Sequence, residues 1–338
     1  MGPLAAPVIS GFVSPTLGWR WVFWIGLIVA GASLALLLFL PETFGPVLLA
    51  RRAKDLRRST GNNQIFARIE LKKKGFKQMA TVTLTRPLRM ICFEPIVSAT
   101  CAYLSLSYGI FYMYFEAYPI IYQDIYKLSP GVSGLMFLPI FAGALIATAL
   151  FIYYDSYLRH AQSLNKNWTK REESRRLPLA CLAGPFCVIS LFWLGWTARE
   201  SIPFYVPMLA GIPFGIGFLL IFMALLNYLA DAYEIFAASA MAATSCCRSL
   251  AGAVLPFSTT VMYNNLGVAW ASSLLALLSL GMCVIPFIFM WKGYVLRAGS
   301  PFCLYLREMK EKEQKQLAIE RAARALTEKA AEDASEKV

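Results

Sequence analysis

The sequence predicts an all-α, polytopic membrane protein, and three observations support this fold class. Apolar and aromatic residues make up 58% of the 338 residues, charged residues make up only 15%, and the mean hydropathy is +0.54. Ordinary globular proteins carry about 25% charged residues. Of the 52 charges, 42 fall in residues 41–89, 155–176 and 292–338. A bilayer imposes such segregation, because one charge in hydrocarbon costs about 2.5–3.5 kcal/mol. The composition therefore argues against a soluble enzyme.

The apolar runs are long enough to cross a membrane. A spanning helix needs about 20 apolar residues, since each residue rises about 1.5 Å and the hydrocarbon core is roughly 30 Å thick. Four charge-free runs satisfy this length: residues 21–40, 128–154, 177–198 and 201–230. A fifth run extends from about residue 91 to 118 and carries two acids.

The run 235–291 is too long for one crossing, so it is predicted to fold back at the polar break 263–267 and to supply two spans. This makes seven spans. Residues 2–14 are apolar but supply only about 20 Å of helix, which is part of an eighth span.

The basic residues predict one orientation. The three charged segments hold 28 of the 32 lysines and arginines. Two predicted spans separate the first segment from the second and four separate the second from the third, so all three lie on one side. Short loops rich in Lys and Arg stay cytoplasmic. We therefore expect the central loop 41–89, the segment 155–176 and the charged tail 292–338 to lie in the cytoplasm.

Other classes of protein find little support. The net charge is +12, but the basic runs flank apolar runs instead of forming one folded basic surface, so nucleic acid is not an expected partner. The 8 cysteines lack CxxC spacing, and HExxH, GxSxG and Walker motifs do not occur. We expect no enzyme activity, no catalytic residue, no metal and no cofactor, and membrane lipids are expected partners.

Two charged segments have local patterns of their own. In the central loop, Val47, Leu48, Ala53 and Leu56 fit one face of a short interfacial helix, and a solvated linker is the alternative. The tail after residue 307 is predicted to be a solvated helix, because its acids and lysines recur at i,i+4 spacing.

Arg248 is the one charge within the run 235–291. In a helix over about 236–261 it lies some 18 Å from one end, near the middle of the bilayer. An ionisable residue at that depth is a candidate for substrate or proton binding, facing a bundle interior or a wet cavity. The alternative is a structural arginine that links two helices through backbone carbonyls.

Glu94 is predicted to lie about two turns into its helix, because Arg86-Pro87 suits a helix start. Pro95 would loosen the local hydrogen bonds and let water reach the carboxylate. We expect Glu94 to bind a proton or a cation, and the alternative is an interfacial acid that snorkels to the membrane surface or pairs with Arg89. Glu116 is expected at the outer rim.

Asp231 and Glu234 are predicted to stand in a cytoplasmic turn without a basic residue of its own. Asp231 is therefore expected to pair with Arg or Lys of a neighbouring loop and to act in an inner gate. Helix capping is the alternative. Gly211 and Pro213 are candidate hinges for gating, and close helix packing is the alternative for them.

Several motifs resemble one family. GPLAAPVISGF at residues 2–12 resembles the Gly/Pro antiporter signature in the fifth helix of drug/proton antiporters of the major facilitator superfamily. GWRWVFW at residues 18–24 is similar to the entry of the sixth helix. PETFGPVLLARRAK at residues 41–54, NYLADAY at 227–233, Arg248-Ser249 and LGVAW at 266–270 are similar to the fungal multidrug and polyamine branch.

The resemblance implies a fold and a function. Such transporters have twelve helices in two six-helix halves with the substrate cavity between them. This chain resembles helices five to twelve, so it is expected to be N-terminally truncated, with about eight transmembrane helices. Residues 1–40 correspond to the last two helices of the N-terminal half, 41–89 to the central loop, 90–291 to a complete C-terminal half, and 292–338 to the cytoplasmic tail.

The family implies proton-coupled export of drugs, polyamines or other small organic compounds by alternating access, in the plasma membrane. The partners so implied are a small organic substrate, a proton and the missing N-terminal helices in trans. The alternative is a truncated, non-transporting membrane protein, either a degenerate product or a partner of intact transporters.

Overall fold

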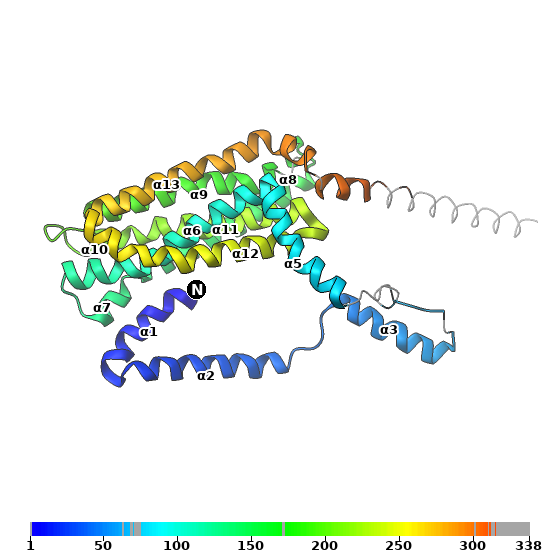
Figure 1. Ribbon diagram of the computed structural model, residues 1–338, viewed down its shortest axis with the longest axis horizontal. Coiled ribbons are helices and arrows are strands. Elements are labelled where there is room, and N and C mark those ends of the chain that lie inside the picture. The colour runs from blue at the N-terminus through cyan, green and yellow to red at the C-terminus, as the bar shows by residue number, and fades with distance from the viewer. Residues whose placement is uncertain are drawn as a thin grey trace, which may run out of the picture. The chain divides into compact units, whose positions relative to one another are not determined.

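The computed structural model describes residues 2–62, 64–67, 70, 76–170, 173–300, 302–309, 311 and 315. Every regular element within these ranges is helical (Figure 1), which confirms the predicted all-α class. The lysine run 72–74 and most of the tail beyond residue 309 lie outside the described residues. The chain divides into two compact units, residues 1–86 with 128–137 and residues 87–127 with 138–338, and each is described by itself.

The first unit begins with two apolar helices. Its elements are α1 (Gly2–Leu17), α2 (Trp19–Leu38), α3 (Gly45–Thr60), the start of α5 (Phe76–Phe93) and α7 (Pro130–Leu135). Gly18, with φ +86°, joins α1 to α2 in a backbone conformation that favours glycine. The partial span predicted over residues 2–14 is thus a helix of 16 residues.

Small residues bring α1 and α7 into close contact. A Cβ atom on Gly11 would come within 2.6 Å of the Pro130 carbonyl oxygen, and one on Gly134 within 2.5 Å of the Pro7 carbonyl oxygen. Only glycine permits such an approach of two membrane helices. The Gly/Pro motif of residues 2–12 therefore serves helix packing in this unit.

The central loop contains the predicted helix as α3, which is amphipathic. Ala53 is buried, whereas Leu48 and Leu56 remain exposed. Arg57 forms two hydrogen bonds with the Glu70 carboxylate, at 2.8 and 2.9 Å, and closes the loop between them.

The second unit is a helical bundle. Its elements are the end of α5, then α6 (Pro95–Pro119), a π-helical turn (Ile120–Ile125), α8 (Leu138–Ser163), α9 (Glu173–Thr197), α10 (Tyr205–Leu209), α11 (Gly211–Tyr233), α12 (Ala237–Val254) and α13 (Thr259–Ala298). Helix α9 packs against α13 and α11, α11 packs against α8, and α6 packs against α12. The core contains buried tyrosines, one of which, Tyr114, bonds Ser190 at 3.0 Å.

The predicted reversal within residues 235–291 is confirmed. Gly267 has non-helical φ 74° and ψ 163°, and the chain turns there, so that the long arm of α13 runs back through the bundle, where it packs against α9 and α6 (Figure 1). Tyr263 and Ser272 lie on the two sides of this turn, and their hydroxyl oxygens are 3.4 Å apart, within hydrogen-bond distance.

Five stretches of the described residues are long and apolar enough to cross a membrane: Trp19–Leu38, Pro95–Ile125, Pro130–Ser163, Glu173–Thr197 and Tyr205–Ala298. The last stretch contains α11, α12 and α13, so these stretches hold the seven predicted spans. Helix α8 continues to Ser163, so Asp155 and Arg159 are helical residues. The sequence predicts them to lie in the charged segment between two spans.

Charged side chains gather at one end of the bundle, which we call the charged end. The C-terminal parts of α8 and α11 and the N-terminal part of α9 meet there through Arg176. The end of α13 joins them through an ion pair between Arg297 and Glu173. At the opposite end, Tyr126 donates to the Arg199 carbonyl oxygen at 2.9 Å. The segments 155–176 and 292–309 thus lie at the same end of this unit, as the span count predicted.

Candidate functional site

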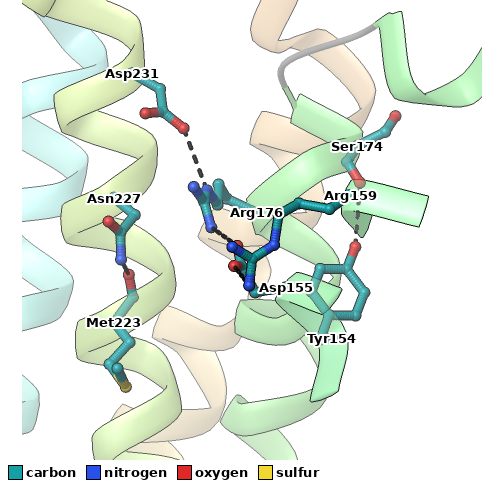
Figure 2. Close-up of polar contacts among 8 residues, drawn as sticks. All are labelled: Tyr154, Asp155, Arg159, Ser174, Arg176, Met223, Asn227 and Asp231. Atoms are coloured by element: carbon teal, nitrogen blue, oxygen red, sulfur yellow. Dashed lines mark hydrogen bonds and ion pairs between the residues drawn. The ribbon is translucent and has the colours of Figure 1, made fainter. Parts of the chain in front are cut away.

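Arg176 links two acids at the charged end. Its Nε donates to Asp231 Oδ2 at 3.2 Å and its Nη1 to Asp155 Oδ1 at 3.3 Å. Figure 2 shows the guanidinium between the two carboxylates, which come from α11 and α8. One arginine of α9 thus connects three helices, because a planar guanidinium presents several donors at fixed angles.

The position of Asp231 explains why it needs a cation. Asp231 lies in the last turn of α11, which ends at Tyr233, and not in a turn between helices as predicted. The C-terminal end of a helix dipole is negative and disfavours an acid. Arg176 supplies the opposite charge, so Asp231 does pair with a basic residue, but this residue lies in helix α9 and not in a neighbouring loop as expected. The role of the pair in an inner gate stays a prediction. The predicted capping role is wrong, because Phe236 occupies the N-cap of α12.

A second arginine extends the network. Arg159 Nη2 lies 3.0 Å from Asp155 Oδ2, one helical turn along α8, and its side chain is 70% exposed. These residues line a cavity of about 440 Å³ whose charged lining consists of three arginines and three acids: Asp155, Arg159, Arg175, Arg176, Asp231 and Glu234. The opposing charges balance, so the cavity is polar without a strong net charge.

Neutral hydrogen bonds hold the helices around this network. Tyr154 donates from its hydroxyl to the Ser174 carbonyl oxygen at 3.3 Å and thereby ties α8 to the start of α9 (Figure 2). Asn227, one turn before Asp231, donates to the Met223 carbonyl oxygen at 2.6 Å within α11. Sequence reasoning missed Tyr154, Asp155 and Arg176, and the i,i+4 spacing of Asp155 and Arg159 was the one local signal for this group.

Glu94 lies at a helix break, which corrects its predicted position two turns into a helix. Helix α5 ends at Phe93, Glu94 is extended with φ −108° and ψ 103°, and α6 begins at Pro95. The residue before a proline is pushed away from helical angles, which explains the break. Pro87 lies inside α5 and does not start a helix.

The Glu94 side chain is buried at the charged end, with only 1% of the residue exposed. Tyr233 donates from its hydroxyl to one carboxylate oxygen at 2.8 Å, and the Phe302 amide donates to the other at 3.4 Å. Among the residues that the structure describes, no cation pairs with this carboxylate, so the alternative pairing with Arg89 is wrong. A carboxylate held by neutral donors has no fixed counter-charge.

Arg248 lies in α12 against aromatic rings. Its guanidinium carbon is 5.4 Å from the centroid of Tyr108 and 5.7 Å from that of Phe222. Within the described ranges the guanidinium forms no hydrogen bond with the backbone carbonyls that the structural alternative requires, and its contacts are these two rings. Cation–π contacts of this kind contribute about 0.5–2 kcal/mol each.

Gly211 and Pro213 lie in the first turn of α11, against α8. A Cβ atom on Gly211 would come within 2.9 Å of Ile140 Cγ1, and further along the same contact Gly143 faces the Ile212 carbonyl oxygen. A proline in the first turn of a helix is tolerated, because its missing N–H would have no partner there. The contact supports close packing, and the role of both residues in gating stays a prediction.

The comparisons agree with the fold. A family profile described as the Major Facilitator Superfamily matches residues 1–256. The chain is 41% identical over 305 residues to the citrinin biosynthesis cluster MFS transporter mrr1 of Monascus ruber, and the alignment covers 89% of this chain and 60% of that protein. It is 39% identical over 300 residues to the efflux pump FUB11 of Gibberella fujikuroi, and this alignment covers 88% of this chain and 52% of that protein.

A third fungal relative is the major facilitator superfamily multidrug transporter mdrA of Aspergillus fumigatus. The identity is 38% over 300 residues, covering 88% of this chain and 49% of that protein. The chain therefore spans about half to three fifths of the length of these relatives.

Proposed function

The chain belongs to the major facilitator superfamily, and from this premise we propose that it works as a transmembrane transporter that exports small organic compounds by alternating access. Drugs, polyamines and similar small molecules are the proposed substrates. The name of one relative, an efflux pump, supports outward movement as the direction, and that of another, a multidrug transporter, supports drugs as substrates. Transport requires no covalent chemistry, so we propose that the chain is not an enzyme.

The observation that carries the proposal is the bridge from Arg176 to Asp155 and Asp231. The side chains of these ion pairs are partly exposed, and ion pairs that reach solvent contribute only about 0–1 kcal/mol each, so they can break and re-form at little cost. Such contacts suit a gate that holds three helices together in one state and releases them in another. We propose that this network is part of the inner gate.

We further propose that Glu94 carries the coupled proton. The carboxylate is buried, is held by two neutral donors, and has no cation among its described partners. Proton uptake would therefore remove the one charge at this break and weaken the two hydrogen bonds that Glu94 accepts. Loss of those bonds would free Tyr233 of α11 and the segment that follows α13.

The proposed location is the plasma membrane, with the charged end, the central loop and the tail in the cytoplasm. The excess of lysine and arginine in these segments supports this orientation. Anionic lipids of the inner leaflet are proposed partners of the basic central loop.

The test is flux in proteoliposomes that contain this chain, with a fluorescent drug as cargo and an imposed pH gradient. We expect gradient-driven flux, and Glu94→Gln should abolish its dependence on the gradient while downhill movement of cargo continues. Glu116→Gln is the matched control, because Glu116 lies in α6, the helix that begins directly after Glu94, but is exposed. No flux with or without a gradient would refute the transport proposal for this chain.

A further inference from the structure

Arg248 shares one face of α12 with Gly252, which lies one helical turn further on. This face meets α6, because a Cβ atom on Gly252 would come within 2.8 Å of Tyr108 Cδ1 and 3.2 Å of Tyr112 Cδ2. The two tyrosine hydroxyls lie 3.2 Å apart. The absence of a side chain at Gly252 therefore lets both rings lie against α12, directly beside the Arg248 guanidinium.

The rings belong to a continuous set from α6 and α11, which we call the aromatic face. Its closest stack joins Phe111 and Phe218, whose centroids are 4.5 Å apart with an interplanar angle of 14°. Four of its rings are only half-buried, so they present surface outward. The members of the aromatic face are Tyr108, Phe111, Tyr112, Phe115, Phe218 and Phe222.

The guanidinium beside this face has unused donors. Arg248 forms neither a hydrogen bond nor an ion pair with any residue in the described part of the chain, whereas Arg176 and Arg297 at the charged end pair with acids. Cation–π attraction uses the faces of the rings and leaves the N–H edges of the guanidinium available. Along α6 the next acid, Glu116, lies two turns and about 12 Å beyond Tyr108.

We propose that Arg248 and the aromatic face bind planar aromatic anions, with the rings stacked on the aromatic face and the carboxylate held by the guanidinium. A carboxylate matches the planar fork of an arginine and accepts two parallel hydrogen bonds from it. Offset or edge-on stacking favours a flat conjugated ring system beside the half-buried tyrosines and phenylalanines of this face. This inference rests on the proposed transport function and narrows its substrate class, since polyamines carry the opposite charge.

The experiment measures equilibrium binding of radiolabelled 2-naphthoate to the full chain in lipid nanodiscs, without any gradient. The neutral isostere 2-naphthamide and the non-aromatic anion cyclohexanecarboxylate serve as comparison probes. We expect 2-naphthoate to bind about tenfold or more tightly than either, because each comparison probe lacks one of the two interactions. Spermidine should not compete. Equal affinities for 2-naphthoate and 2-naphthamide would overturn the inference.

Variants then assign the effect to named side chains. Arg248→Gln should weaken 2-naphthoate binding about tenfold or more and leave 2-naphthamide binding unchanged. The 2-naphthoate affinity of Arg248→Lys should lie between those of the unmodified chain and Arg248→Gln, because lysine keeps the charge but lacks the planar guanidinium. Tyr108→Leu should weaken both aromatic probes. The matched control is Arg199→Gln, since Arg199 also lies over an aromatic ring, at 5.5 Å from Trp196, but at the opposite end of the bundle.

The outcomes separate this inference from the transport proposal. A chain that binds 2-naphthoate through Arg248 but moves no cargo would uphold the site and refute transport. Export of a cationic drug without any binding of 2-naphthoate would uphold transport and refute the site. If Arg248→Gln does not fold, the tenfold preference of the unmodified chain for the anion over its neutral isostere decides the question.

Discussion

Arg176 Nε lies 3.2 Å from Asp231 Oδ2, although the two residues are 55 positions apart in the chain. The contact joins the start of α9 to the last turn of α11, where the helix dipole alone would disfavour an acid. The same guanidinium also holds Asp155 of α8. Arg176 therefore neutralises two acids at once, and its removal should affect the bundle more than removal of either acid.

The first prediction concerns this asymmetry. Arg176→Gln leaves Asp231 without its cation and leaves Asp155 with Arg159 alone, whereas Asp231→Asn also removes an acid from a helix C-terminus. We expect Arg176→Gln to lower the free energy of unfolding by about 1 kcal/mol and Asp231→Asn to lower it by less than about 0.5 kcal/mol. Thermal unfolding in detergent measures both, and the pairing would be refuted if Asp231→Asn were the more damaging change. Arg159→Gln is the control, because that side chain is 70% exposed and its loss should have little effect.

The second prediction concerns Tyr233, which is fully buried and donates its hydroxyl to Glu94. Glu94→Ala would leave this hydroxyl without its acceptor and should lower the free energy of unfolding by about 1–3 kcal/mol. Glu94→Gln keeps a carbonyl oxygen and should cost clearly less. The double variant Glu94→Ala with Tyr233→Phe should recover part of the loss, because both polar partners are then gone. Denaturant unfolding of the four proteins measures the coupling, and strict additivity would contradict the hydrogen bond.

These two sites differ in how far sequence could predict them. The spans and the reversal at Gly267 follow from local hydropathy and one polar break, so they were predictable. The sequence also encodes the break at Glu94, because a residue before proline avoids helical angles, but Arg86-Pro87 also suits a helix start and predicts the wrong position for it. The partners of Arg176 depend on which faces of α8, α9 and α11 meet. Hydropathy does not specify these faces, so the pairing of Asp231 was predictable as a type of contact but not as Arg176.

The third prediction concerns Gly215, at the contact between α11 and α8. A Cβ atom there would collide with the Ile140 carbonyl oxygen and come within 3.0 Å of the Ala144 amide nitrogen, and neither backbone atom can move aside cheaply. Gly215→Ala should lower the free energy of unfolding by about 1–3 kcal/mol. Gly281→Ala is the matched control in α13, since no described atom lies within 4 Å of its added methyl group. That change should be neutral or stabilise by up to about 1 kcal/mol. Equal effects at both positions would show that helix packing is not tight at Gly215.

The last prediction concerns pH and the central loop, outside the membrane spans. The Arg57 guanidinium donates two hydrogen bonds to the Glu70 carboxylate, and these bonds, helped by the Ala67 amide, hold the pKa of Glu70 below its ordinary value. A lowered pKa in the folded loop means that the pair contributes fully at pH values above the ordinary glutamate pKa. The contribution is lost as the pH falls through the lowered pKa, because protonation removes the charge that Arg57 binds. We therefore expect the protection of amides at the C-terminal end of α3, corrected for the intrinsic pH dependence of exchange, to fall on acidification only below the ordinary glutamate range. Glu70→Gln should remove this pH dependence. Arg57→Lys should move the midpoint of the Glu70 titration back toward the ordinary value, since lysine keeps the charge but cannot donate two parallel hydrogen bonds to the carboxylate.

A Glu70 titration midpoint at or above the ordinary value, read from its carboxyl ¹³C signal, would show that this ion pair does not close the loop.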